Sequence, residues 1–298
     1  MLQQSYTNDW TATDGEDTSQ TPFICQSLEQ IERERAGRPL VHTRLPHYAI
    51  VWVRGGKGVY HIDFKSYQTL HDTLFFVSPE QVQQLVIEHP QGYVILLSPE
   101  FMEAIGITAA FLNTLGLFSS YEERPPLLLS PDDTPMFSLQ MQHLQQEYER
   151  PQTPFRYESI GAWLRILLIE AYRLQVSAQP QPRNILPMQI ATVRIFKKQV
   201  ESFYKKYHRV AEYADMQNTI AAHLNPMVRN ALGITAKEYI QQRVLLEAKR
   251  MALHTNLTAK EIGQQLGYDD PNQFGRFFKA ALGINFSEFK THIQQVYR

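Results

Sequence analysis

The chain has 298 residues, a formal net charge of −1 and the composition of an ordinary globular protein, so two or three domains are expected. Its single cysteine, Cys25, excludes an internal disulfide, and no apolar run is long enough for a membrane span. The N-terminus has no basic region followed by an apolar core, so we expect a cytoplasmic protein without a secretory signal.

Residues 1–20 are polar, acidic and poor in aliphatic side chains, which predicts a disordered tail. Short β-rich segments follow within 21–110, separated by glycine-rich turns at 55–58 and 89–92. These segments are YAIVWV, VYHIDF, LFFVSP, QLVIE and YVILLS, which begin at residues 48, 59, 74, 84 and 93. Many short strands at near-regular spacing predict a small β-barrel or sandwich.

Helical periodicity begins after Ser98-Pro99-Glu100, and we expect a helical segment over 111–178. Its second long helix carries a wide apolar stripe, formed by Ile160, Trp163, Leu164, Leu167, Leu168 and Ala171. Part of this stripe must cover the β-domain. The rest either packs in the same core or pairs with a second subunit, which would make the protein a homodimer.

Proline and glutamine at 179–187, after Ser177, indicate an extended linker, and the pattern of 188–298 then predicts an all-helical domain. In that domain, 257–290 predicts a helix, a tight turn, a second helix and a short third one. Gly267 ends the first helix, and Asp270 caps the second, where Pro271 suits the first position.

The second helix of this segment separates apolar from polar side chains. Phe274, Phe277 and Phe278 form its apolar face. The other side carries Asn272, Gln273, Arg276 and Lys279. Short polar side chains and a guanidinium on an exposed helix face are what reading of base edges in a major groove requires.

The stretch 210–240 repeats the same pattern, which indicates two copies of one structural unit. At an offset of 50 the matching pairs are Leu224 and Phe274, Arg229 and Lys279, Gly233 and Gly283, Glu238 and Glu288, and Tyr239 and Phe289. Ahead of the turn the offset is 49, as for Tyr213 and Ile262. One residue has therefore been gained or lost in the turn.

The repeat coincides with a charge asymmetry. Residues 191–298 carry 16 Lys and Arg against 9 Asp and Glu, a net charge of +7, whereas the rest carries 13 against 21, a net charge of −8. A basic end on an acidic body is typical of a nucleic-acid-binding module joined to a domain that does not bind nucleic acid.

The chain from about residue 190 to its end resembles the DNA-binding domain of the AraC/XylS family of bacterial transcription regulators. The sequences that carry the resemblance are EYAD, EYI, EAKRM, KEIGQQLGYDDPNQFGRFFK and SEFK, which begin at residues 212, 238, 247, 260 and 287. It implies an AraC-type domain over 188–298, with helix-turn-helix motifs at about 208–233 and 258–283. The strand order within 21–110 resembles the cupin-like sensory domain of such regulators.

The expected fold is therefore an α+β two-domain protein: an N-terminal cupin-like β-barrel with a helical appendage, and a C-terminal all-α domain with two helix-turn-helix motifs joined by a linker helix. The resemblance implies double-stranded DNA, a small-molecule effector and RNA polymerase as partners. It implies base reading by Asn272, Gln273, Arg276, Asn225 and Ala222 and phosphate contacts by Arg229 and Lys279. Candidate effector-pocket residues are Tyr48, Trp52, Tyr60 and His61, although each could simply fill the core.

The first motif departs from the family pattern at two positions. Pro226 stands where the second repeat has Arg276, and a proline inside a helix costs about 3 kcal/mol. Gln217 stands where the second repeat has Leu266, and a buried glutamine needs partners. Either the first motif is kinked and reads DNA weakly, or its second helix starts at Pro226 with Asn225 as the cap.

His42, His47 and His61 form no complete cluster at ligand spacing, so we expect no metal and no cofactor. Without a nucleophile–base arrangement, we expect no enzyme. The leading hypothesis is a sequence-specific DNA-binding transcription regulator, an activator, controlled by a small effector in the β-domain. The alternatives are a regulator whose first domain only dimerises and, less favoured, a cupin enzyme with an attached helical domain.

Overall fold

The computed structural model describes residues 22–35, 43–118, 126–150, 153–178 and 187–296. The predicted tail at 1–20, nearly all of the predicted linker at 179–187 and His42 lie outside these residues. The chain divides into two compact units, Met1–Gln179 and Pro180–Arg298. Among the described residues, no helix is both long and apolar enough to cross a membrane.

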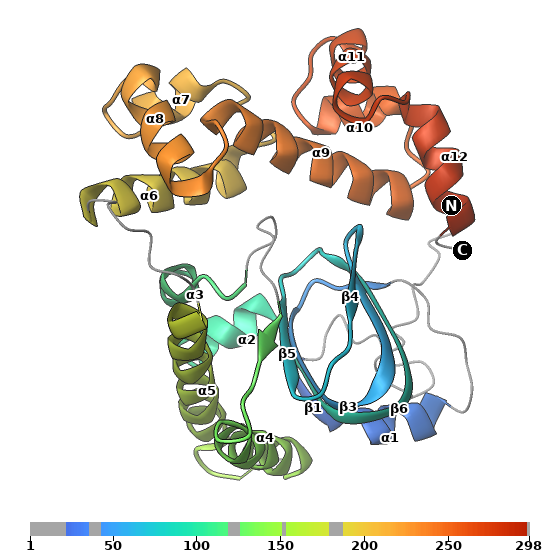
Figure 1. The fold of residues 1–298 in the computed structure, drawn as a ribbon, viewed down its shortest axis with the longest axis vertical. Coiled ribbons are helices and arrows are strands. Elements are labelled where there is room, and N and C mark those ends of the chain that lie inside the picture. The colour runs from blue at the N-terminus through green and yellow to red at the C-terminus, as the bar shows by residue number, and fades with distance from the viewer. Residues whose placement is uncertain (1–21, 36–42, 119–125, 151–152, 179–186, 297–298) are drawn as a thin grey trace. The chain divides into compact units, whose positions relative to one another are not determined.

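The N-terminal unit is built on an antiparallel sheet and also contains five helices (Figure 1). The strands are β1 (Phe23–Ser27), β2 (Thr43–Arg44), β3 (Tyr48–Ile62), β4 (Lys65–Gln68), β5 (Thr73–Val77), β6 (Val82–Leu97) and β7 (Leu127–Leu128). The helices are α1 (Leu28–Arg35), α2 (Pro99–Ala104), α3 (Ala109–Leu115), α4 (Thr134–Glu149) and α5 (Arg156–Ala178).

The order of the sheet is β1-β6-β3-β5-β7, with β2 paired to β6 and β4 paired to β3. Among the described strands this path is open, since no pairing joins β7 back to β1. The prediction of a β-rich first domain is therefore confirmed, but the cupin-like barrel is not seen.

Two predicted turns are wrong, because the strands on either side of each run together. Residues 55–58 lie inside β3 and 89–92 lie inside β6, and these two strands pair along almost their whole length. The register shifts at Gly55, and Gly92 has φ +140° with its Cα against the Trp52 carbonyl. Glycine allows such bulges without breaking the ladder, so here it bends a strand instead of ending it.

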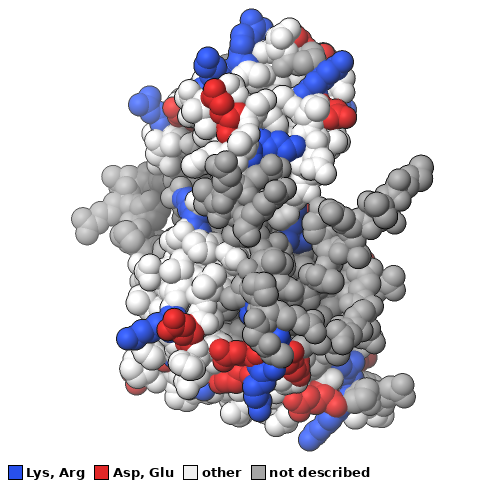
Figure 2. Space-filling view, turned by 90° about the vertical axis from the view of Figure 1, so that its right-hand side faces the viewer, with Lys and Arg blue, Asp and Glu red and all other residues white. Residues whose placement is uncertain are grey.

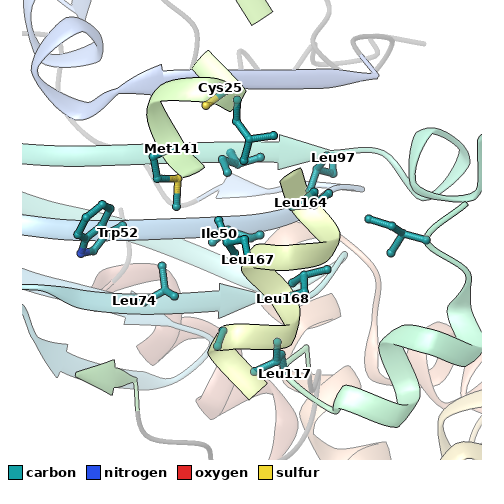
Figure 3. Close-up of a cluster of buried hydrophobic side chains, with 14 of the residues drawn as sticks. Cys25, Ile50, Trp52, Leu74, Leu97, Leu117, Met141, Leu164, Leu167 and Leu168 are labelled. Atoms are coloured by element: carbon teal, nitrogen blue, oxygen red, sulfur yellow. The ribbon is translucent and has the colours of Figure 1, made fainter. Parts of the chain in front are cut away.

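Alternate residues along the strands pack on opposite faces of the sheet. One face is covered by the helices after β6, and its core joins Ile50, Trp52 and Leu74 to Met141 and Leu164 (Figure 3). The other face packs Val51, Val53 and Tyr60 with residues of α1. The predicted stripe of α5 is confirmed as core, since its members except the half-buried Trp163 are buried.

The C-terminal unit is all helical. Its helices are α6 (Pro187–Phe203), α7 (Val210–Asp215), α8 (Ala221–Leu232), α9 (Ala236–His254), α10 (Ala259–Gln265), α11 (Pro271–Leu282) and α12 (Phe286–Val296). We call α7 and α8 with their turn the first module, and α10 and α11 with their turn the second module. As predicted, α9 joins the two modules.

The internal repeat is also visible in how the helices begin and end. Both α8 and α11 end at a left-handed glycine, Gly233 with φ +74° and Gly283 with φ +78°. The next helix then starts with a reciprocal pair of hydrogen bonds between its cap and Glu238 or Glu288. Asn285 thus does for α12 what Thr235 does for α9.

Candidate nucleic-acid interface

The second module has the geometry expected of a helix-turn-helix. Gly267 adopts φ +82° directly after α10, so the chain turns there. The Asp270 side chain then accepts a hydrogen bond from the Asn272 N–H at 2.9 Å, with Pro271 in the first turn of α11. Local sequence alone therefore fixes where α11 begins.

The buried side of α11 is held by aromatic packing. Phe274 and Phe278 are fully buried. The ring of Phe278 lies 5.2 Å from that of Phe286 and 5.4 Å from that of Phe289, measured between centroids. Edge-to-face rings of this kind fix the rotation of α11 about its axis, which decides which side chains it presents outward.

The exposed side of α11 brings together the four residues predicted for it. Asn272, Gln273, Arg276 and Lys279 are all exposed. Arg276 is 78% exposed, and its Nη2 lies 3.8 Å from the Asp270 carboxylate. Donors and acceptors are thus presented on one helix face, where a guanidinium can make two parallel hydrogen bonds to a guanine.

In the first module, α8 starts at Ala221 and contains Pro226 in its interior. The alternative of a late helix start at Pro226 is therefore wrong. Leu224 and Val228 are buried, while Ala222 and Arg229 are exposed, as the repeat predicts. Pro226 is exposed too, so the position that holds Arg276 in the second module has no hydrogen-bond donor here.

Asn225 does not take the outward position predicted for it. It is half-buried, and its Oδ1 accepts a hydrogen bond from the Ala236 N–H at 2.9 Å. This bond satisfies one of the free N–H groups at the start of α9. The structure therefore gives Asn225 a capping role in place of base reading.

His223 is an exposed residue that the sequence reasoning missed. It precedes Leu224 on α8 as Gln273 precedes Phe274 on α11, so the offset of 50 assigns it the position of Gln273. The offset of 50 pairs His223 with Gln273, so comparing the two repeats at each position of the second helix would have identified His223 from the sequence. Gln217, the other departure, is half-buried and donates to Gln199 Oε1 at 2.9 Å.

A charged network inside the unit holds α9, from which both modules extend. The Arg243 Nε contacts both Glu201 oxygens at 3.1 and 3.0 Å, and its Nη1 lies 3.4 Å from Glu247. Burial acts to lower the pKa of Arg243, but the neighbouring carboxylates and Tyr204 outweigh it and raise the pKa above its ordinary value. Arg250, fully buried, pairs with Glu247 at 3.6 Å.

The caps of α9 and α10 lower the pKa of two carboxyl groups. Hydrogen bonds from the backbone and then the hydroxyl of Thr258 lower the pKa of Glu261, and Thr235 does the same for Glu238. Each carboxylate is thereby held in its charged form at the start of a helix, where the helix dipole also favours negative charge.

The four candidate effector-pocket residues do not meet in one cavity. Trp52 and Tyr48 lie on the helix-covered face of the sheet, but Tyr60 lies on the opposite face, where its hydroxyl donates to Gln83 Oε1. His61 is paired with the Ser66 hydroxyl at 2.8 Å. The register shifts between Val53 and Lys57 change which side alternate residues of β3 face, so Trp52 and Tyr60 lie on opposite faces.

A search of the described residues for three or more His, Cys, Asp or Glu side chains placed to hold a metal ion finds no such group. Lys and Arg side chains stand at the surface of the C-terminal unit, interspersed with Asp and Glu (Figure 2). On the face that Figure 2 shows, the cations of the C-terminal unit are scattered and form no single dense patch.

Comparison with known proteins agrees with this geometry. A family model described as a helix-turn-helix domain matches residues 213–292, which includes the second module and all of the first except the start of α7. The lactose operon transcription activator of Staphylococcus xylosus is 27% identical over 125 residues, which is 41% of this chain and 45% of that protein. The chain thus spans less than half the length of that relative.

A second relative covers more of the chain. The uncharacterized HTH-type transcriptional regulator YfiF of Bacillus subtilis (strain 168) is 19% identical over 246 residues, which is 82% of this chain and 76% of that protein. Among solved structures, ToxT from Vibrio cholerae covers 91% of this chain and 98% of its own, with 14% identity and a TM-score of 0.44. Such a score gives the whole-chain likeness no weight for function. The relatives are transcription regulators and not enzymes.

Proposed function

We propose that this chain, whose C-terminal unit carries an AraC-type helix-turn-helix domain, is a sequence-specific DNA-binding regulator of transcription. The observation that carries the proposal is the exposed face of α11. Its buried rings fix the helix, and Asn272, Gln273 and Arg276 project from the opposite side. These are the side-chain types that pair with adenine and guanine edges in a major groove.

In the proposed complex the two modules contribute unequally. α11 offers three polar side chains to bases and Lys279 to a phosphate, because all four are exposed on one face. α8 offers Ala222 and His223 at its start and Arg229 for a phosphate, while Pro226 can only make apolar contact. We therefore assign most of the sequence preference to the second module.

The test is a selection from a random DNA library with the full-length protein, followed by binding measurements on the selected site and on shuffled DNA. A regulator of this kind should prefer its site by a factor of about 10³ or more. If the protein binds selected and shuffled DNA equally at several salt concentrations, it binds DNA only through non-specific attraction to the phosphates, and the proposal is wrong.

The N-terminal unit is proposed to bind a small effector between the sheet and α4. Trp52 and Gln140 are buried, and neither the indole N–H of Trp52 nor the Gln140 amide has a hydrogen-bond partner among the described residues. Phe137, one turn before Gln140, packs its ring 6.5 Å from that of Trp52. Buried unpaired polar groups are costly, so a polar ligand that satisfied them would stabilise this layer.

Thermal-shift screening of the full-length protein with sugars and aromatic acids tests the effector. A ligand at 100 times its dissociation constant should stabilise the folded protein by about 2.7 kcal/mol. Gln140→Leu should abolish that shift, whereas the exposed-site control Gln142→Leu on the same helix should keep it. If no compound shifts the wild type, the alternative of a first domain without a sensing role is favoured.

We also propose a homodimer through α4 and α5, an activating contact with RNA polymerase and a cytoplasmic location. The dimer proposal rests on exposed apolar side chains, since Leu139 is 50% and Ile166 is 44% exposed. Sedimentation of Ile166→Glu should show a shift toward monomer relative to the wild type. A matched substitution of the exposed Leu70 on another part of the unit should leave the mass unchanged.

A further inference from the structure

The segment between α6 and α7 packs against the turn of the second module, although about 60 residues of chain separate them. His208 Nε2 lies 2.9 Å from the Leu266 carbonyl oxygen. Since a carbonyl can only accept, this nitrogen carries the proton and donates. The His208 ring also lies 4.5 Å from the Tyr268 ring, tilted by 32°. The α6–α7 segment is itself bonded to the first module, because the Tyr213 hydroxyl of α7 donates to the Tyr207 carbonyl at 2.8 Å. We call His208, Leu266 and Tyr268, with Lys205 and Gly267, the inter-module contact.

The backbone at Gly267 lies so close to the α6–α7 segment that no side chain fits between them. A Cβ at this position would stand 2.1 Å from the Lys205 carbonyl oxygen, far inside any real contact distance. The clash is with backbone, which cannot rotate away as a side chain can. Any residue other than glycine would therefore push the α6–α7 segment and the turn apart.

The left-handed conformation by itself does not explain this glycine. The corresponding turn position of the first module, at the offset of 49, is Asn218, which adopts φ +52° with a side chain in place. Gly283 adopts φ +78°, and a Cβ there would meet nothing within 4 Å. Among the described left-handed residues of the C-terminal unit, Gly267 is the one at which a neighbouring backbone excludes a Cβ. The glycine is needed for the contact between modules.

Residues 255–258 link α9 to α10, and α10 and α12 also pack against α9, so α9 carries the second module. The inter-module contact attaches the same module at a second place and restricts its rotation relative to α9. It lies at the α10–α11 turn, directly before the recognition helix, so it constrains α11 itself.

We propose that the inter-module contact fixes the distance and relative orientation of α8 and α11, and so sets the spacing between the two half-sites that the protein accepts. This inference rests on the proposed function. On B-DNA one added base pair displaces the second half-site by about 3.4 Å and rotates it by about 35° around the axis. A rigid pair of modules cannot follow both changes and should reject the altered spacing.

Gly267→Ala is the variant that tests the inference, and Gly283→Ala is its matched control. Both place a methyl group on a left-handed residue and carry the same conformational penalty, but only Gly267→Ala also meets the Lys205 carbonyl. Binding of the full-length proteins is compared on the selected DNA and on the same DNA with one base pair inserted between half-sites. We expect the preference for the original spacing to fall about tenfold in Gly267→Ala, as when one set of base contacts is lost, and to persist in Gly283→Ala.

A second measurement does not depend on DNA. Spin labels attached after Asn230→Cys and Ala280→Cys, both exposed at the ends of α8 and α11, report the distance between modules. Cys25 is fully buried and should stay unlabelled. One narrow distance distribution is expected in the wild type and in Gly283→Ala, and a broad or shifted one in Gly267→Ala with unchanged circular dichroism.

The outcomes separate this inference from the proposed function. If Gly267→Ala matches Gly283→Ala in both spacing preference and distance distribution, the contact does not position the modules, although DNA binding stands. If the wild type selects no DNA, the proposed function fails, and the distance measurement still judges the contact. Should Gly267→Ala not fold, His208→Phe keeps a ring against Tyr268 but removes the donor to Leu266, and it should broaden the distances in the same direction.

Discussion

Arg276→Ala should change DNA binding while leaving the folded protein almost unaffected. The side chain is 78% exposed, and its ion pair with Asp270, at 3.8 Å, is long and open to solvent. Exposed pairs of this kind contribute about 0–1 kcal/mol. Alanine is also the better helix former, so the free energy of unfolding should stay within about 0.5 kcal/mol of the wild type.

The effect on specific DNA should be far larger. A guanidinium that makes two hydrogen bonds to a guanine contributes about 1–3 kcal/mol of discrimination, which corresponds to about 5- to 150-fold in affinity. The loss should be confined to the site with the contacted base pair. A site with that pair already replaced should bind the wild type and the variant about equally.

Fluorescence anisotropy measures the affinity of each protein for the specific site, the single-replacement site and shuffled DNA. Lys279→Ala is the control on the same helix. If Lys279 contacts a phosphate, its loss should weaken all three DNAs alike and reduce the salt slope by about one. Equal weakening by Arg276→Ala on specific and shuffled DNA would show that Arg276 is a phosphate contact and that its base-reading role is mistaken.

Three further predictions concern the helices of the C-terminal unit. Pro226→Ala should raise the melting temperature, because it restores a backbone N–H inside α8 and removes a cost of about 3 kcal/mol; an unchanged or lower temperature would mean that the local backbone already accommodates the ring. Asn285→Ala should lower unfolding free energy by about 0.5–2 kcal/mol in urea titrations and Asn285→Ser by much less, and equal losses would contradict the capping role. The hydrogen bonds from Thr258 lower the folded-state pKa of Glu261 below its ordinary 4.5, so the stability they contribute is present above that value and is lost as pH falls through the lowered pKa. Glu261→Gln should therefore flatten the fall in melting temperature below about pH 4.5, and an unchanged acid profile would count against it.

The local sequence determined most of the C-terminal unit. Helix boundaries followed from caps and glycines whose partners lie three or four residues away, as with Thr258 and Glu261. The offset of 50 then allowed the end of α8 and its buried and exposed positions to be predicted from those of α11. Interactions of this range depend little on the rest of the fold, and so they can be read without it.

The sheet could be predicted only in its broad character. β-forming residues indicated strands, but glycines at 55–58 and 89–92 looked like turns. Whether such glycines end a strand or bend it depends on the partner strand, and β3 and β6 pair with each other through both places. That partner is far away in sequence, so the placement of Tyr60 on the face opposite to Trp52 could not be predicted.

Tertiary structure alone decided how the two modules are positioned relative to each other and which of their polar residues remain exposed. Asn225 fits an exposed helix position by spacing, but the start of α9 lies within reach of its side chain and takes its oxygen. Gly267 reads as an ordinary helix stop, and only the fold brings the Lys205 carbonyl against it. The sequence by itself determined the two modules, because the bonds that build each one are local. Their fixed separation depends on backbones about 60 residues apart, and no local pattern records such a contact.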